Sequence, residues 1–82
     1  MKSYKSAFEL ITDDKAQIKL YKLKSELMNC INDQIDNLKL TQVQASKIMK
    51  VSQSRVSNIA TGRISIFTYD LLFLMYERIK AV

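Results

Sequence analysis

The stretch that decides the fold is LTQVQASKIMKVSQSRVSNIATGR, which covers residues 40–63. It contains two short helical patterns. The first covers residues 41–49, and the second places Val56 and Ile59 three residues apart on one face. The link between them, residues 50–52, is too short for anything but a sharp change of direction. We therefore expect two short helices that cross at a tight turn.

Each of these helices has a suitable first residue. The hydroxyls of Thr41 and Ser52 can accept hydrogen bonds from free N–H groups in the first turn. Ser46 is small at the expected crossing, where a bulky side chain would push the helices apart. The apolar contacts that should fix the crossing come from Val43, Ile48, Met49, Val51, Val56 and Ile59. Two helices joined in this way, here residues 41–62, form a helix-turn-helix, whose second helix can enter the major groove of DNA.

The outward side of the second helix is polar and adaptable. Amide side chains can pair with adenine edges and arginine with guanine, while hydroxyls both donate and accept hydrogen bonds. The expected base-reading residues are Gln53, Ser54, Arg55, Ser57, Asn58 and Thr61. Phosphate contacts are expected from Gln42, at the first helical position, and from the flanking Lys50 and Arg63. A solvated surface with no ligand is the alternative for the same residues.

The charge distribution supports contact with a polyanion. The chain has 82 residues and a net charge of +5, and it has room for a single domain, residues 1–82. Residues 37–69 contain five basic side chains and no acidic one, whereas the rest of the chain balances eight against eight. The whole basic excess therefore lies in and beside the two short helices, where it favours phosphate binding. An ordinary solvated face is the alternative.

The inventory of residues disfavours several other classes of protein. With no Pro and a single Gly, an all-α fold is expected. With no His and a single Cys, the chain lacks the residues for a zinc site or a Ser-His-Asp triad, and we expect neither enzyme activity nor a metal or other cofactor. Cys30 falls in an apolar helical pattern and is expected to be a buried thiol. No apolar run is long enough to cross a membrane and no signal peptide is evident, so a cytoplasmic protein is expected.

A long helix should precede the helix-turn-helix. Asp13 and Asp14 come before it, and Asp13 can cap it. The helix should end near residues 37–39. One apolar stripe recurs at spacings of three and four, through Ala16, Leu20, Leu23, Leu27, Ile31, Ile35 and Leu38. This heptad-like regularity also fits a coiled coil, but packing on the helix's own domain is the expectation. Residues 1–12 are expected to be a short helix or an arm, which either packs on the body or binds a partner.

The segment after the helix-turn-helix should form one more helix. Gly62 stands where a left-handed residue ends the second short helix, and residues 63–67 are expected to be an extended connector. Thr68 can cap a last helix over residues 69–80, within a C-terminal segment 68–80. Apolar residues nearly encircle this helix, so part of it should contact a second subunit. The candidates for that dimer contact are Leu72, Phe73, Met75 and Tyr76.

At this point the sequence resembles a known family. Residues 40–63 resemble the helix-turn-helix of Xre-type transcriptional regulators, which include phage Cro and C1-type repressors. The residues that carry the resemblance are TQ at 41–42, Ser46, VSQSRVS at 51–57 and Gly62. Similarity outside this stretch, from residues 8–10 to residues 63–72, is to the compact Xre-type antitoxins of toxin–antitoxin modules.

The resemblance implies a fold and a function. The fold is a lambda-repressor-like, all-α bundle of five helices, or of four helices plus an N-terminal arm. The function is that of a bacterial or phage-encoded homodimer that binds an inverted-repeat operator in double-stranded DNA and represses its own operon. A phage Cro- or C1-like regulator is one alternative. Another is an antitoxin whose main role is to neutralise a protein toxin.

One position departs from the family's pattern. The family usually has Gly at the start of the turn, where this chain has Lys50. If the backbone there is left-handed, a residue other than Gly costs about 1 kcal/mol. Lys50 is therefore either a tolerated strain or a residue kept for a phosphate contact.

Overall fold

The computed structural model describes residues 14–82 of the protein. Its elements are α2 (Lys15–Asn37), α3 (Gln42–Met49), α4 (Gln53–Ala60), a 3-10 helix η1 (Ile64–Ile66) and α5 (Tyr69–Lys80). The described part of the chain contains no strand, and the all-α prediction is confirmed. None of the helices within it is long and apolar enough to cross a membrane. The expected arm, residues 1–12, and the expected cap Asp13 lie outside the described residues.

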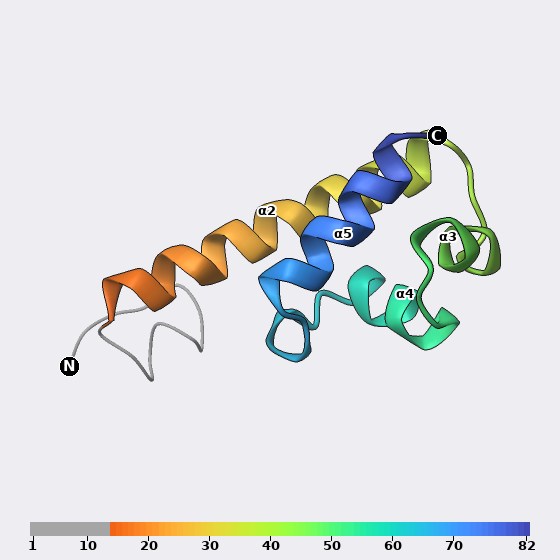
Figure 1. The fold of residues 1–82 in the computed structure, drawn as a ribbon. Coiled ribbons are helices and arrows are strands. Elements are labelled where there is room, and N and C mark those ends of the chain that lie inside the picture. The colour runs from red at the N-terminus through yellow and green to blue at the C-terminus, as the bar shows by residue number, and fades with distance from the viewer. Residues whose placement is uncertain (1–13) are drawn as a thin grey trace.

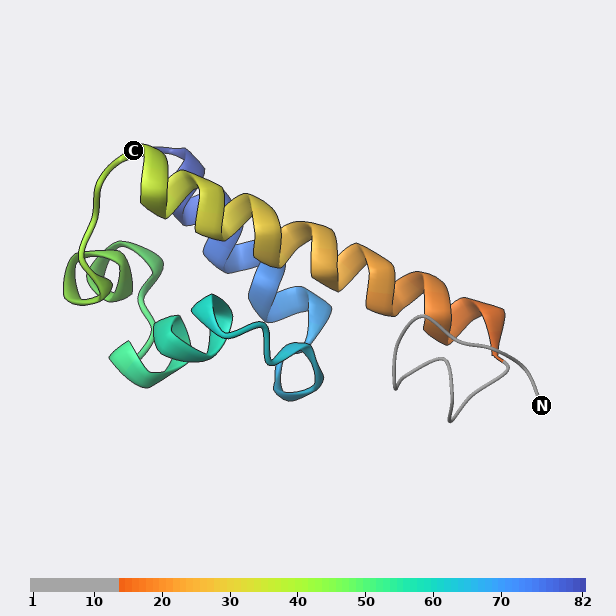
Figure 2. The ribbon, with the colours of Figure 1, turned by 180° about the vertical axis from the view of Figure 1, so that it is seen from behind.

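The helices form two groups that share one core (Figure 1). α2 and α5 lie side by side, and α3 and α4 pack against them near the C-terminal half of α2. The view from behind shows the same arrangement (Figure 2). In both views the N-terminal half of α2 extends past α5, so the domain is elongated, at 45 × 20 × 18 Å.

Each α-helix in residues 14–82 contributes to the core. The buried side chains are Met28, Ile31, Ala45, Met49, Val56, Ile59, Phe67, Leu72, Met75 and Ile79. Within the helix-turn-helix, one expectation was wrong, because Val43 is 44% exposed. The fully buried small residue of α3 is Ala45. Ser46 is only half-buried, and its hydroxyl donates to the carbonyl of Val43 at 2.7 Å.

The helix starts are capped by side chains. The caps expected at Thr41, Ser52 and Thr68 are confirmed, since each hydroxyl accepts from a first-turn N–H at 3.1–3.2 Å. Thr41 forms a full capping box, in which its own N–H donates to the Gln44 side chain at 2.8 Å. The N-cap of α2 is Asp14, which accepts from the N–H of Ala16. Each cap contributes about 1 kcal/mol to helix stability.

Three helices end in the same left-handed conformation. The positive φ angles are 54° at Lys39, 59° at Lys50 and 75° at Gly62. At each end, the next N–H bonds the carbonyl five residues back, at 3.0–3.1 Å, in a Schellman-type closure. The left-handed Gly62 was expected, and the left-handed backbone suspected at Lys50 is confirmed.

The long helix differs from its prediction in its N-terminal half. Of the expected stripe only Ile31 is fully buried, and Leu20 and Leu23 are 40% and 37% exposed. Cys30 is exposed, so the prediction of a buried thiol was wrong. The reason is that α5, α4 and η1 cover one side of α2 and leave the Cys30 side open.

The connector after α4 also differs. Residues 63–67 were expected to be extended, but Ile64–Ile66 form one turn of 3-10 helix. Among the apolar side chains of this connector, Phe67 is fully buried, Ile64 is half-buried and Ile66 is exposed. The turn brings Phe67 inward directly before the cap of α5.

Three side chains from α2 and α5 bind the C-terminal ends of other helices. Asn32 donates to the carbonyl of Ile59 at 3.1 Å, and Gln34 donates to the carbonyl of Ile79 at 3.5 Å. Arg78 donates to the carbonyl of Met49 at 3.0 Å. Carbonyls at a helix end lack intrahelical partners and lie at the negative end of the helix dipole, so these donors suit them. The ends of both α3 and α4 are thereby fixed to the long helices.

We predict that Arg78→Met lowers the free energy of unfolding by about 1–2 kcal/mol, because the half-buried Met49 carbonyl loses a charged donor. Chemical denaturation measures the change. Lys80→Met is the matched control, since it removes the same charge from the same turn of α5. Lys80 is exposed and pairs only with its own helix, where a hydrogen bond to Glu77 raises the pKa of Lys80. Equal effects of the two changes would show that the Met49 contact does not stabilise the fold.

Candidate nucleic-acid interface

The faces of α4 are set by its two buried residues. Val56 and Ile59 point into the core. With about 100° of rotation per residue, Ser54, Ser57 and Asn58 lie within about 50° of the opposite, outward direction. Thr61, the C-cap, continues this outward line. Gln53 and Arg55 lie on the two flanks, about 90–110° from it.

Several of the expected base-reading side chains have contacts within the domain. The hydroxyls of Ser52 and Ser54 lie 3.1 Å apart. The Thr61 hydroxyl donates to the carbonyls of Ser57 and Asn58 at 3.1 and 3.3 Å, and this leaves its lone pairs free to accept. The guanidinium of Arg55 lies over the ring of Phe67, 5.8 Å from its centroid, which fits a cation–π contact.

The three expected phosphate-binding residues lie at three points around α4. Gln42 is the first residue of α3, Lys50 forms the left-handed turn into α4, and Arg63 follows Gly62 at the exit from α4. All three are exposed. The start of α3 also presents backbone N–H groups that lack helical partners, a donor set suited to a phosphate.

The charges on the segment that contains α3 and α4 are of one sign. Lys39, Lys47, Lys50, Arg55 and Arg63 are all exposed, and no carboxylate occurs between residues 37 and 69. Such a surface attracts a polyanion over the range of the Debye length, and the attraction weakens as salt is added. Among residues 14–82 no group of three or more potential metal ligands comes together.

Two positioning residues had no signal in the sequence. Arg78 lies 29 residues from Met49, and Asn32 lies 27 residues from Ile59. No local pattern could have identified these pairs. They fix the end of α3 and the end of α4, and hence the angle at which α4 is presented.

The expected dimer contact on α5 needs a correction. Leu72 and Met75 are fully buried in the core of their own domain, so they cannot contact a second subunit directly. Phe73 is 46% exposed and Tyr76 is half-buried. Leu74 is exposed as well, although it was not among the expected residues.

Fold and site together define the class of protein. Two short helices cross at a left-handed turn, and the second presents a polar outer face among basic residues, which is the arrangement of a helix-turn-helix DNA-binding domain. A family model described as "Helix-turn-helix domain" matches residues 9–81, so the chain belongs to this family. Searches of curated proteins and of solved structures found no match.

We predict that Lys50→Gly raises the free energy of unfolding by up to about 1 kcal/mol, because Gly adopts the left-handed conformation without strain. The same change should weaken binding to DNA by removing a phosphate contact. Thermal denaturation and a DNA titration measure the two effects.

Lys39→Gly is the matched control for this change. Lys39 has the same charge, is also exposed and has a φ of 54°. It follows α2, however, whereas Lys50 lies in the turn between α3 and α4. Both changes should stabilise the fold, and only Lys50→Gly should weaken binding strongly. Unchanged affinity in Lys50→Gly would remove Lys50 from the interface.

Proposed function

We propose that the protein is an Xre-type transcriptional regulator that binds a specific double-stranded DNA sequence and represses its own operon as a homodimer. The observation that carries the proposal is the outer face of α4, which is polar, free of carboxylates and surrounded by exposed basic residues. If these residues only kept the protein soluble, the basic excess would be spread over the chain. Instead, it is concentrated on and beside the two short helices. The family match supports DNA binding as the activity.

In the proposed complex, α4 lies in the major groove. Ser54, Ser57, Asn58 and Thr61 face the base edges, and Gln53 and Arg55 reach bases from the flanks. Gln42, Lys50 and Arg63 hold phosphates on either side and so set the depth and angle of α4. The remaining helices serve to hold α3 and α4 rigid.

The operator in this proposal is an inverted repeat. A two-fold symmetric dimer presents two copies of α4, so the half-sites should lie about one helical turn apart, near 34 Å. Binding to such a site upstream of its own gene would exclude RNA polymerase and repress the operon. Two copies per operator are therefore part of the function.

The direct experiment is a gel shift with the gene's own upstream DNA, at two salt concentrations. We expect saturable binding of that DNA in preference to a scrambled sequence, with an affinity that falls as salt rises. A protein with no salt-dependent affinity for any DNA would be a structural helical bundle, and the proposal would fail.

Substitution of two glutamines can distinguish contacts to DNA bases from contacts to DNA phosphates. Gln53→Ala should cost roughly 1–3 kcal/mol at one base position and relax the preference there. Gln42→Ala should weaken binding to all DNA sequences by a similar factor, because in the proposed complex Gln42 contacts only the phosphate backbone of the DNA. A titration against operators with single base changes distinguishes them. If Gln53→Ala lost the same affinity for every operator variant, Gln53 would contact the DNA phosphates rather than a base.

Neutralisation of a partner protein is a second candidate function, as in the antitoxins that the sequence resembles. The observation that favours it is exposed apolar surface on η1 and α5, from Ile66, Phe73 and Leu74. Co-expression with the products of adjacent reading frames tests it. Stable co-purification of one of them, lost in Phe73→Asp, would support this function.

A further inference from the structure

The apolar stripe of α2 continues past the core toward the N-terminus, where the described part of the domain leaves it exposed. The core side of the helix is occupied by Met28 and Ile31, and Leu27, Ile35 and Leu38 pack against the core beside them. From this side of the helix, residues recur toward the N-terminus at spacings of four, three, four and three: Ala16, Leu20, Leu23, Leu27 and Cys30, of which Leu27 also packs against the core. This is the heptad spacing of a coiled-coil seam.

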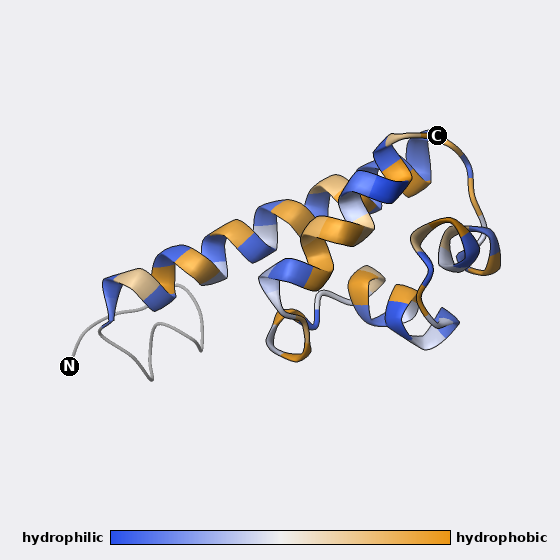
Figure 3. Cartoon of the chain, in the orientation of Figure 1, coloured by the Kyte–Doolittle hydropathy of each residue, from blue (hydrophilic) through white to orange (hydrophobic). Residues whose placement is uncertain are grey.

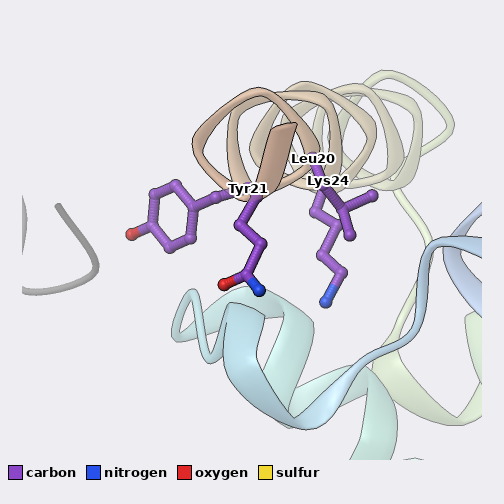
Figure 4. Close-up of a pocket in the computed structure, with 4 residues that line it drawn as sticks. Leu20, Tyr21 and Lys24 are labelled. Atoms are coloured by element: carbon purple, nitrogen blue, oxygen red, sulfur yellow. The ribbon is translucent and has the colours of Figure 1, made fainter. Parts of the chain in front are cut away.

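The stripe is accessible over most of its length. Ala16, Leu20, Leu23 and Cys30 are exposed, and only Leu27 is half-buried. Hydrophobic residues recur along α2 into the half that extends past α5 (Figure 3). In the close-up, Leu20 and Lys24 leave α2 toward one side and Tyr21 toward another, around an open hollow that Gln17 also lines (Figure 4). A helix that projects from its domain with regularly spaced leucines has the form of one half of a helix pair.

The charges on α2 indicate what covers the stripe. Residues 15–24 contain four lysines and no carboxylate, whereas residues 26–36 contain Glu26, Asp33 and Asp36 and no basic residue. Each half therefore complements the other half of an identical helix that runs in the opposite direction. A parallel, in-register pair would place the lysine-rich halves against each other. The charge pattern thus favours a second copy of this chain in an antiparallel arrangement.

We infer that two copies of the protein associate through the Ala16–Cys30 stripes of α2, packed antiparallel around a two-fold axis near residue 25. Leu23 of one copy lies opposite Leu27 of the second, and Leu20 lies opposite Cys30. Lys19 then approaches Asp33 of the second copy, once on each side of the axis. This inference rests on the proposed function, for which it supplies the surface that joins the two DNA-binding units.

The first test measures self-association without DNA, so its outcome is separate from that of the gel shift. Sedimentation equilibrium should show a dimer, and Leu23→Asp should raise its dissociation constant about tenfold or more. Val43→Asp is the matched control, because Val43 is 44% exposed against 37% for Leu23 but lies on α3. A chain that is monomeric overturns the inference. So does a dimer that Leu23→Asp leaves intact and Phe73→Asp dissociates.

The second test determines direction and register. In the antiparallel pair the two Cys30 residues lie about 15 Å apart along the axis, given a rise of about 1.5 Å per residue. That is beyond the Cα separation of about 7 Å that a disulfide can bridge. Mild oxidation should therefore leave the native chain uncrosslinked and convert Leu20→Cys to a covalent dimer, joined between position 20 and Cys30.

Val43→Cys is the control for chance encounters between exposed thiols, and it should not crosslink appreciably. Rapid crosslinking of the native chain through Cys30 would show a parallel pair and overturn the arrangement. A Leu20→Cys chain that crosslinks no faster than Val43→Cys would overturn it as well. Neither outcome depends on whether the protein binds DNA.

Discussion

The direction of α4 depends on how α3 ends. The chain reverses at Lys50 in a left-handed conformation, and the N–H of Val51 closes the end of α3 on the carbonyl of Ser46. The neighbouring carbonyl of Met49 is held by Arg78 from α5. Because this turn sets the angle between α3 and α4, loosening it would change the direction of α4 and of the side chains on its outer face. The strained residue Lys50 thus lies in the turn that leads from α3 into α4.

The two halves of α2 have different roles. The C-terminal half supplies Met28 and Ile31 to the core and fixes the end of α4 through Asn32. The N-terminal half contributes little to that core and keeps Leu20 and Leu23 in solvent. Exposed leucines are unfavourable in a monomer because burying a leucine is worth about 1.5–3 kcal/mol. Association through this half would recover part of that free energy, and it would also place two recognition helices on one rigid body.

The features that could be predicted from the sequence are those that depend on residues close together in the chain. The caps at Thr41, Ser52 and Thr68, the left-handed Gly62 and the bounds of α5 all follow from residues within one turn of each other. The exposure of Cys30 and Val43 could not be predicted in this way, because it depends on which distant helix covers which side of α2 or α3. The polar face of α4 was predictable once Val56 and Ile59 were assigned inward. The contacts that fix its angle were not, since they join residues 27 and 29 positions apart.

The polar face of α4 is also connected to the core through Arg55. Its guanidinium lies over Phe67, which is fully buried between η1 and the start of α5. A long, flexible side chain loses conformational entropy when it binds, and a stacking partner in the free protein reduces that loss. If α4 binds DNA as proposed, Arg55 is already held on its flank, while the shorter Ser57 and Asn58 need little ordering. The outer side of α4 therefore combines one cation held in place with short side chains, and the buried Phe67 that holds the cation also belongs to the core.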